Sequence, residues 1–195
     1  FGRYITDEVV NTLLESPEGR QLGGERRRIT LMLSDLRGFS TLCEGLGPEQ
    51  VVQILNIYLG AMADVIGEYK GSINEFIGDA ILAVFGAPVP QDDHPERAVA
   101  CALAMQRAMT RVNAELAAHA LPALEMGIGV HTGEVVVGNI GSSRRAKYGV
   151  VGRHVNLTSR IESYTVGGQV LISESTARAI GERLRARDRF EVRPK

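Results

Sequence analysis

Two long amphipathic helices alternate with short apolar strands along this chain, and their order limits the folds it can adopt. Apolar residues recur at helical spacing from Pro48 to just before Gly71, and again from Pro95 to Ala118. The strands expected around these helices are residues 29–34, 72–77, 80–85, 124–132 and 134–139. This order predicts an α+β fold with a ferredoxin-like βαββαβ core, in which both helices cover one face of a mainly antiparallel sheet.

Glycines mark the expected turns, and further elements follow the core. Gly78 and Asp79 lie between two strands as a tight hairpin turn, and Gly133 is expected to turn the next strand back. The additional C-terminal α/β elements expected are a strand at 148–151, a helix at 155–164, a strand at 170–173, a helix at 175–183 and a strand at 190–192.

The length of 195 residues fits one domain with a substantial core. Residues 1–24 are expected to form a short linker helix and turn at the end of an upstream region, and residues 25–195 the domain itself. Because the chain begins with Phe1 rather than Met, we expect it to be a domain taken from a longer protein.

Charge and cysteine content exclude several classes of protein. The net charge is −1, from 22 basic and 23 acidic residues, which argues against a nucleic-acid binder driven by bulk charge. Cys43 and Cys101 cannot form a disulfide framework or a four-ligand zinc site, so two reduced thiols are expected. Apolar runs are far shorter than the roughly 20 residues that span a bilayer, and no signal peptide is visible. A cytoplasmic domain is expected, whether or not its parent protein is attached to a membrane.

Familiar nucleotide and metal motifs are missing from the sequence. Neither a P-loop nor a Rossmann fingerprint occurs, although the chain has 22 glycines, and the GIG at 127–129 lies inside a predicted strand. The four histidines show no ligand spacing, and His131 is expected to pack or form hydrogen bonds in its strand.

Two aspartates are candidates for chemistry because each lies at the end of a strand. Asp35 directly follows the first strand, and Asp79 lies at the tip of the hairpin. Adjacent strands are about 4.8 Å apart, so these carboxylates can meet, and they repel each other unless a cation lies between them. Oxygen ligands favour Mg²⁺ or Mn²⁺ over Zn²⁺. Taken singly, each aspartate is better explained as a turn-capping residue.

Asn156 and Arg160 lie four residues apart on a predicted helix, so both project from one face. An arginine fork suits phosphate oxygens, and an asparagine amide can hold a sugar. An ordinary exposed helix face explains this pair in isolation.

Several segments in order resemble the successive signatures of class III nucleotidyl cyclases, and the similarity covers nearly the whole chain. The segments are FGRY (1–4), LSDLRGFS (33–40), FIGD (76–79), GEV (133–135), GNIG (138–141), YGVVG (148–152) and VNLTSR (155–160). The first of them resembles the linker helix that precedes the catalytic domain in bacterial members, and the whole set resembles bacterial homodimeric guanylate cyclases of the cyanobacterial type.

The resemblance implies a head-to-tail homodimer with two composite active sites, each binding a nucleoside triphosphate between the subunits. Asp35 and Asp79, helped by the backbone carbonyl of Leu36, would bind two divalent cations, Mg²⁺ or Mn²⁺. Asn156 from the partner would orient the ribose, and Arg160 would stabilise charge on the α-phosphate. Because this chain contains both sets, the resemblance implies a homodimer rather than a pseudo-heterodimer. It also implies an upstream sensor in the same chain.

Two further phosphate contacts are weighed by the same resemblance. Lys195 matches the family lysine that grips the terminal phosphates. Arg144 and Arg145 align poorly and are expected to be solvated.

Purine choice in this family resides at two positions, here Glu75 and Gly149. Adenylate cyclases place Lys at the first position and Asp or Thr at the second. A glutamate can accept from both guanine N1–H and the 2-amino group, so Glu75 favours GTP as the substrate. Gly149 removes the acceptor that adenylate cyclases use, but it supplies no donor for guanine O6.

The sequence therefore predicts a guanylate cyclase that converts GTP to cyclic GMP and pyrophosphate. The alternatives are an adenylate cyclase acting on ATP, a catalytically silent regulatory module with the same fold, and a palm-type two-metal nucleotidyltransferase. The near-neutral charge weighs against a nucleic-acid template.

Overall fold

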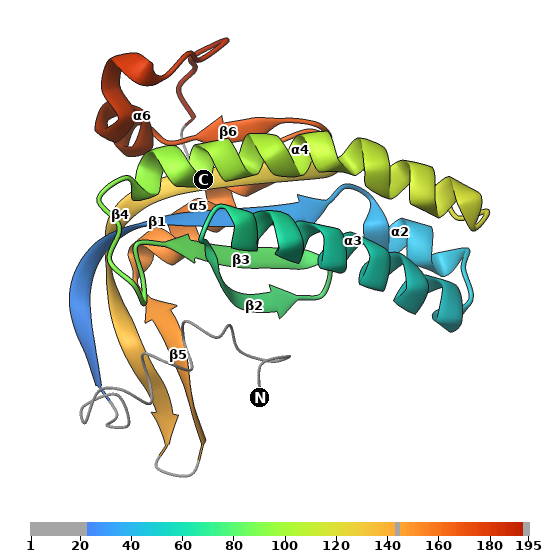
Figure 1. The fold of residues 1–195 in the computed structure, drawn as a ribbon, viewed down its shortest axis with the longest axis horizontal. Coiled ribbons are helices and arrows are strands. Elements are labelled where there is room, and N and C mark those ends of the chain that lie inside the picture. The colour runs from blue at the N-terminus through green and yellow to red at the C-terminus, as the bar shows by residue number, and fades with distance from the viewer. Residues whose placement is uncertain (1–22, 143–144, 193–195) are drawn as a thin grey trace.

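The computed structural model describes residues 23–142 and 145–192, which form one sheet covered by helices (Figure 1). The linker helix expected at the N-terminus, Arg144 and Lys195 lie outside the described residues. In chain order the elements are β1 (Gly23–Leu36), α2 (Phe39–Glu44), α3 (Pro48–Glu68), β2 (Ser72–Ile77), β3 (Ala80–Phe85), α4 (His94–Ala118), β4 (Met126–Ser142), β5 (Arg145–Val151), α5 (Arg153–Ser163), β6 (Val170–Ile172), α6 (Glu174–Ile180) and a 3₁₀ turn (Gly181–Arg183).

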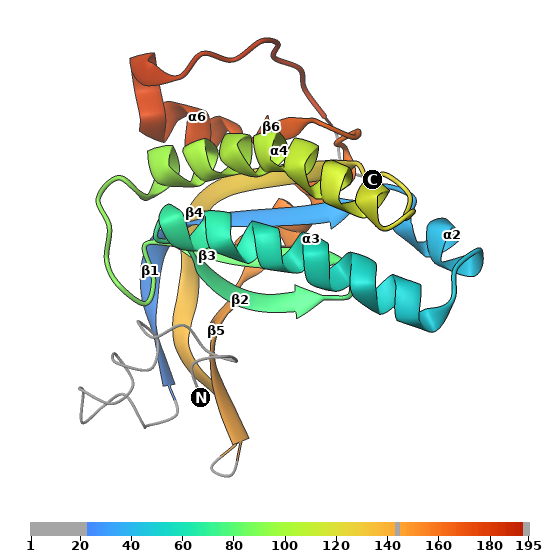
Figure 2. The same cartoon turned by 45° about the vertical axis from the view of Figure 1, so that its right-hand side comes forward.

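The sheet confirms the predicted βαββαβ core. Its strand order is β2-β3-β1-β4-β5, all antiparallel, and β6 is added in parallel beside β4. Helices α3 and α4 lie side by side over one face, and α5 lies behind the sheet against β4 (Figures 1 and 2). The alternation of side chains in β1 explains both layers, because Met32 packs toward α3 and α4, whereas Ile29 and Leu31 pack on the opposite face.

The main core lies between the sheet and helices α3 and α4. Tyr58 and Met62 on α3 and Met105 on α4 are fully buried there. By length and a mean hydropathy of 1.3, α3 would pass as a membrane-spanning helix. Its inner face nevertheless packs against the sheet, as in a core helix.

The turn predicted at Gly133 is wrong. Strand β4 runs without a break through this residue, and β1 pairs with it from Gly23↔Asn139 to Leu36↔Met126. Gly133 instead leaves room for a helix residue on the α5 side, because a Cβ atom there would lie 2.4 Å from His154 Nδ1. A glycine inside a strand can mark a close approach as readily as a turn.

Other boundaries also differ from the predictions. β1 begins at Gly23, six residues before the predicted start, because the basic residues that precede Ile29 pair with β4, and Arg26 bonds Glu134 at 3.0 Å. Helix α2 was not predicted. The strand predicted at 190–192 is absent, and Phe190 is exposed there without a neighbouring strand.

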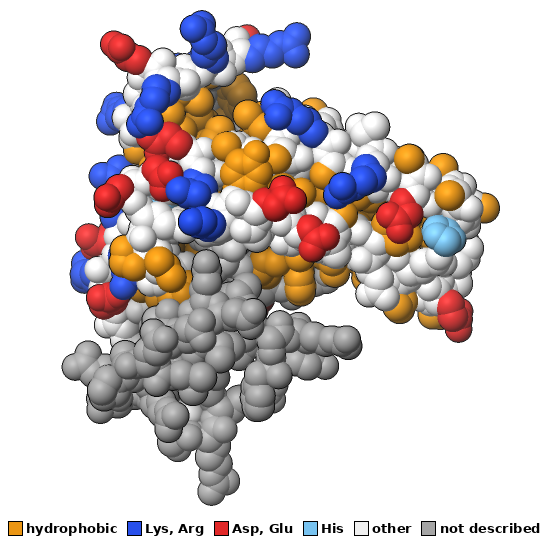
Figure 3. Space-filling model, viewed as in Figure 1, with side chains coloured by type: hydrophobic (Ala, Val, Ile, Leu, Met, Phe, Trp, Pro, Cys, Tyr) orange, Lys and Arg blue, Asp and Glu red, His pale blue; other side chains and the backbone are white. Residues whose placement is uncertain are grey.

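Acidic and basic side chains are interspersed over α3 and α4 (Figure 3). This face therefore lacks the continuous basic surface that nucleic-acid binding requires.

Candidate active site

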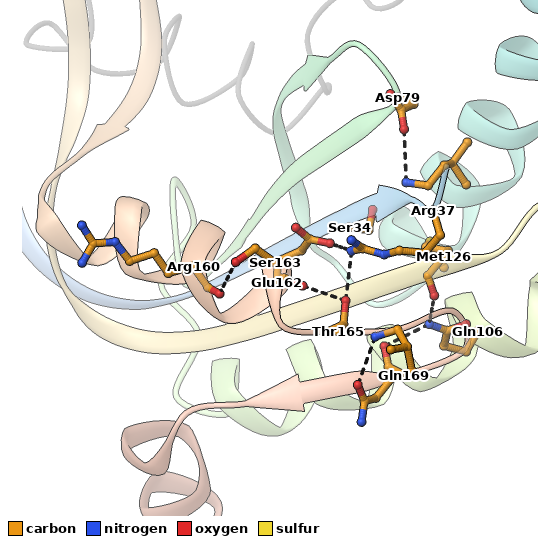
Figure 4. Close-up of polar contacts among 12 residues, drawn as sticks. Ser34, Arg37, Asp79, Gln106, Met126, Arg160, Glu162, Ser163, Thr165 and Gln169 are labelled. Carbon is orange, nitrogen blue, oxygen red and sulfur yellow. Dashed lines mark hydrogen bonds and ion pairs between the residues drawn. The ribbon is translucent and has the colours of Figure 1, made fainter. Parts of the chain in front are cut away.

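The structure brings Asp35 and Asp79 together at one edge of the sheet. β1 pairs with β3 up to Ser34↔Ile81, which places the end of β1 beside the β2–β3 turn that carries Asp79. Within that turn Gly78 has φ of 65°, a conformation that glycine adopts without strain. The backbone N–H of Leu36 donates to Asp79 Oδ2 at 3.2 Å (Figure 4).

The Asp35 carboxyl is partly buried beside a second carboxylate, and both conditions disfavour its ionised form. Burial of the Asp35 carboxyl and the neighbouring Asp79 raise its pKa to about 6, against the opposing charge of Arg37. A divalent cation would relieve this repulsion, and the oxygen donors present fit Mg²⁺ or Mn²⁺. Among residues 23–142 and 145–192, no group of three or more His, Cys, Asp or Glu side chains could hold a metal ion. Backbone carbonyls, water and substrate phosphates could supply further ligands.

We expect Mn²⁺ affinity to depend on pH, because a metal ion bound by Asp35 would compete with protons for its carboxylate. Its pKa of about 6 means that the carboxylate is available above that pH. Affinity should be constant above pH 7 and fall by up to about tenfold for each pH unit below 6. A Mn²⁺ titration followed by EPR between pH 5 and 8 measures this, with Asp35→Asn as the control that removes the dependence. Affinity that is flat from pH 5 to 7 would contradict the assignment.

Asn156 and Arg160 lie on α5 and are exposed. Arg160 points away from Arg37 and Asp79 in the close-up (Figure 4). A single chain therefore does not bring Arg160 together with the aspartates.

An ion pair missed by the sequence analysis joins α5 to the end of β1. Arg37 pairs with the buried carboxylate of Glu162, and its Nη2 donates to Thr165 Oγ1 at 3.0 Å (Figure 4). Two glycines of β4 permit this approach, since a Cβ at Gly127 would lie 1.9 Å from Thr165 Oγ1 and one at Gly129 would lie 2.5 Å from the Glu162 backbone nitrogen. Alternate glycines in a strand were the only signal of this contact.

The two expected purine positions share one set of neighbours. Lys147 Nζ on β5 donates to Glu75 Oε2 on β2 at 2.8 Å, and Asn74 Nδ2 lies 3.5 Å from Glu75 Oε1. A Cβ built on Gly149 would be 3.8 Å from both Asn74 Oδ1 and Lys147 Cε. Lys147 was not predicted as part of this site, although it lies two residues before Gly149 and so shares its face of β5. The ion pair between Lys147 and Glu75 is exposed and contributes little to the stability of the fold.

The phosphate contact expected of Lys195 stays a prediction, as does the solvated state expected of Arg144 and Arg145. Arg144 and Lys195 are outside the described residues, and for Arg145 the structure gives the backbone pairing with Ser142 alone.

The chain is similar in sequence and fold to known proteins. Residues 24–195 match the family described as "Adenylate and Guanylate cyclase catalytic domain". The chain is similar to the crystal structure of the guanylyl cyclase Cya2, with 57% identity, a TM-score of 0.87 and coverage of 89% of this chain and 88% of that one. The adenylyl cyclase CyaB from P. aeruginosa is 36% identical with a TM-score of 0.78, covering 82% and 83% of the two chains.

A curated relative is also similar in sequence. Adenylate cyclase 1 of Rhizobium meliloti (strain 1021) is 35% identical over 162 residues, which are 83% of this chain and 24% of the relative. The chain thus spans about a quarter of that protein. From the family match over most of its length, together with a sheet and helices that agree with solved class III cyclases, it follows that this chain belongs to the adenylate and guanylate cyclase catalytic domain family.

Proposed function

We propose that this domain is a guanylate cyclase that acts as a head-to-tail homodimer with two composite sites. The observation that carries the proposal is the separation of two intact half-sites on one chain. Asp35 and Asp79 meet at one sheet edge, whereas Asn156 and Arg160 are exposed on α5. A silent regulatory domain has no need to retain both halves.

The half-sites divide the reaction between two chains. Asp35, Asp79 and the Leu36 carbonyl would hold two divalent cations, which when bound lower the pKa of the ribose 3′-hydroxyl and neutralise triphosphate charge. Asn156 of the other chain orients the ribose, so that the 3′-oxygen lies in line with the α-phosphorus. The new bond forms from the 3′-oxygen to that phosphorus, the bond to pyrophosphate breaks and the hydroxyl proton passes to water. Arg160 stabilises the charge that develops on the α-phosphate.

Glu75 supports GTP as the substrate. Its carboxylate can accept from guanine N1–H and the 2-amino group together. Adenine offers N1 as an acceptor, so the same carboxylate would leave polar groups unpaired at a cost of about 1–3 kcal/mol per group. Lys147 Nζ lies 2.8 Å from Glu75 Oε2 and so places a hydrogen-bond donor beside this carboxylate. Gly149 has no side chain that could supply one.

Adenylate cyclase activity is the alternative function. The similarity to two adenylate cyclases favours it. The Glu75 carboxylate weighs against it, because it is a hydrogen-bond acceptor and adenine N1 needs a donor.

We also propose that Lys195 contacts the terminal phosphates and that residues 1–24 connect residues 25–195 to an upstream sensor. The domain would act in the cytoplasm, where GTP is present and Cys43 and Cys101 stay free thiols.

Mixing two inactive variants tests the composite site. A chain with Asp35→Asn keeps its own α5, and a chain with Arg160→Ala keeps its own aspartates. A heterodimer of the two contains one intact site, so a mixture should recover about a quarter of wild-type activity by random pairing in a twofold dimer. Cyclic nucleotide formation by the mixture and by each variant alone measures this. Activity no higher than the sum of the separate variants would contradict the proposal.

A further inference from the structure

The first turn of α5 is held to the sheet by a pair of histidines. Its N-cap residue is Gly152, which offers no side chain to cap the helix. His154 in this turn instead bonds His131 of β4, with Nδ1 2.7 Å from Nε2. The two rings stack with centroids 4.9 Å apart and an interplanar angle of 23°.

The neighbours of the pair assign its protons. Arg153 Nε donates to His154 Nε2 at 3.4 Å, so the proton of neutral His154 is on Nδ1 and is donated to His131 Nε2. His131 then carries its own proton on Nδ1, which lies 2.8 Å from Ser173 Oγ and 3.3 Å from Ser175 Oγ. Every ring nitrogen is thus satisfied when both imidazoles are neutral.

The geometry gives this contact little freedom to adjust. His131 is 3% exposed, so loss of its partner would leave a buried nitrogen without a hydrogen bond. The ring of His154 lies directly over Gly133, where a Cβ would approach Nδ1 to 2.4 Å. The contact therefore fixes the position of the first turn relative to β4.

That turn is continuous with the residues proposed to act on substrate. Asn156 is two residues after His154, and Thr158 Oγ1 donates to the His154 carbonyl at 2.8 Å. Arg160 lies one turn further along the same helix, before the Glu162–Arg37 ion pair that anchors the other end. The histidine pair is therefore the anchor nearest to Asn156.

We propose that His131 and His154 are positioning residues for cyclisation, whose mutual hydrogen bond sets the direction in which Asn156 and Arg160 project from the chain. This inference rests on the proposed function, because it assigns α5 to a site completed by the aspartates of the other chain. It predicts that the pair affects turnover at the site that α5 enters and leaves the aspartate site of its own chain intact.

Kinetics of volume-conserving variants test the proposal. In His154→Leu or His131→Leu the hydrogen bond is lost, and kcat should fall by about 10- to 100-fold with KM for the nucleotide changed less than about threefold. His154→Asn, which keeps an amide donor near the Nδ1 position, should stay within about threefold of wild type. Gly133→Ala, which displaces the ring, should repeat the loss. His119→Leu, at the exposed end of α4, is the matched control and should have no effect.

Mixed dimers separate a positioning role from a general structural one. A His154→Leu chain mixed with an Asp35→Asn chain forms heterodimers with one site made of intact aspartates and an intact α5. Activity should therefore rise above the sum of the two variants, as it should for Arg160→Ala with Asp35→Asn. If the Arg160 mixture recovers activity and the His154 mixture does not, the positioning role is wrong and the composite site stands. If neither mixture recovers, the composite site is wrong and the inference falls with it. Unchanged kcat in both leucine variants would also overturn it.

Discussion

Replacing Asp35 or Asp79 with asparagine should lower cyclic nucleotide formation by at least about 10³-fold, the scale expected when charge stabilisation in a phosphoryl transfer site is removed. Asparagine keeps the size of the side chain and removes the charge that would hold a divalent cation. Turnover of purified variants with saturating Mn²⁺, measured by chromatography of the products, gives the effect.

These variants should lose activity without losing the fold. The pKa of Asp35 is raised by burial and by Asp79, so ionised Asp35 destabilises the metal-free domain at neutral pH. Removing one charge should leave the melting temperature of the metal-free domain unchanged or higher. Asp64→Asn, on the exposed side of α3, is the matched control and should retain activity. Wild-type turnover in either aspartate variant would contradict the metal assignment.

The double variant Glu75→Lys/Gly149→Asp should shift substrate preference toward ATP by about 100-fold or more in the ratio of kcat/KM values, because a polar group that loses its complement is strongly disfavoured. The lysine would donate to adenine N1, and the aspartate would accept from the adenine amino group. Position 149 has space for the new side chain, since a Cβ there meets no atom closer than 3.7 Å.

Single-site variants make this result interpretable. Glu75→Lys alone brings a second ammonium group beside Lys147, so it should lose GTP activity more than it gains ATP activity. Glu68→Lys, at an exposed position on α3, controls for the change in charge and should leave the preference for GTP over ATP unchanged. A double variant that still prefers GTP would disprove the account of base selection.

Local patterns predicted most of the core of the fold. The periodicity of α3 and α4 and the Gly78–Asp79 hairpin depend on neighbours within one element, and the structure confirms all three. Gly133 was misassigned because the reason for a glycine there is not local. The ring of His154 occupies the space that a side chain at position 133 would fill, and His154 belongs to a helix that packs across the strand. The helical fate of Phe39–Glu44 was missed because six residues are too few for a clear period.

The candidate site also combines features that local patterns predict with contacts between distant elements. The proximity of Asp35 and Asp79 followed from two strand ends, and the structure places these residues together, whereas their roles stay predictions. The Arg37–Glu162 and Lys147–Glu75 pairs join residues more than 70 positions apart. Such pairs depend on the sheet order and on where α5 packs, and neither is written in a local pattern.

The most direct test of a guanylate cyclase is product analysis. The purified domain is incubated with Mn²⁺ and equal concentrations of GTP and ATP, and the cyclic products are separated and quantified. Mainly cyclic GMP is the predicted result. Mainly cyclic AMP would contradict the role given to Glu75, and no cyclic product from a confirmed dimer would contradict the catalytic function itself.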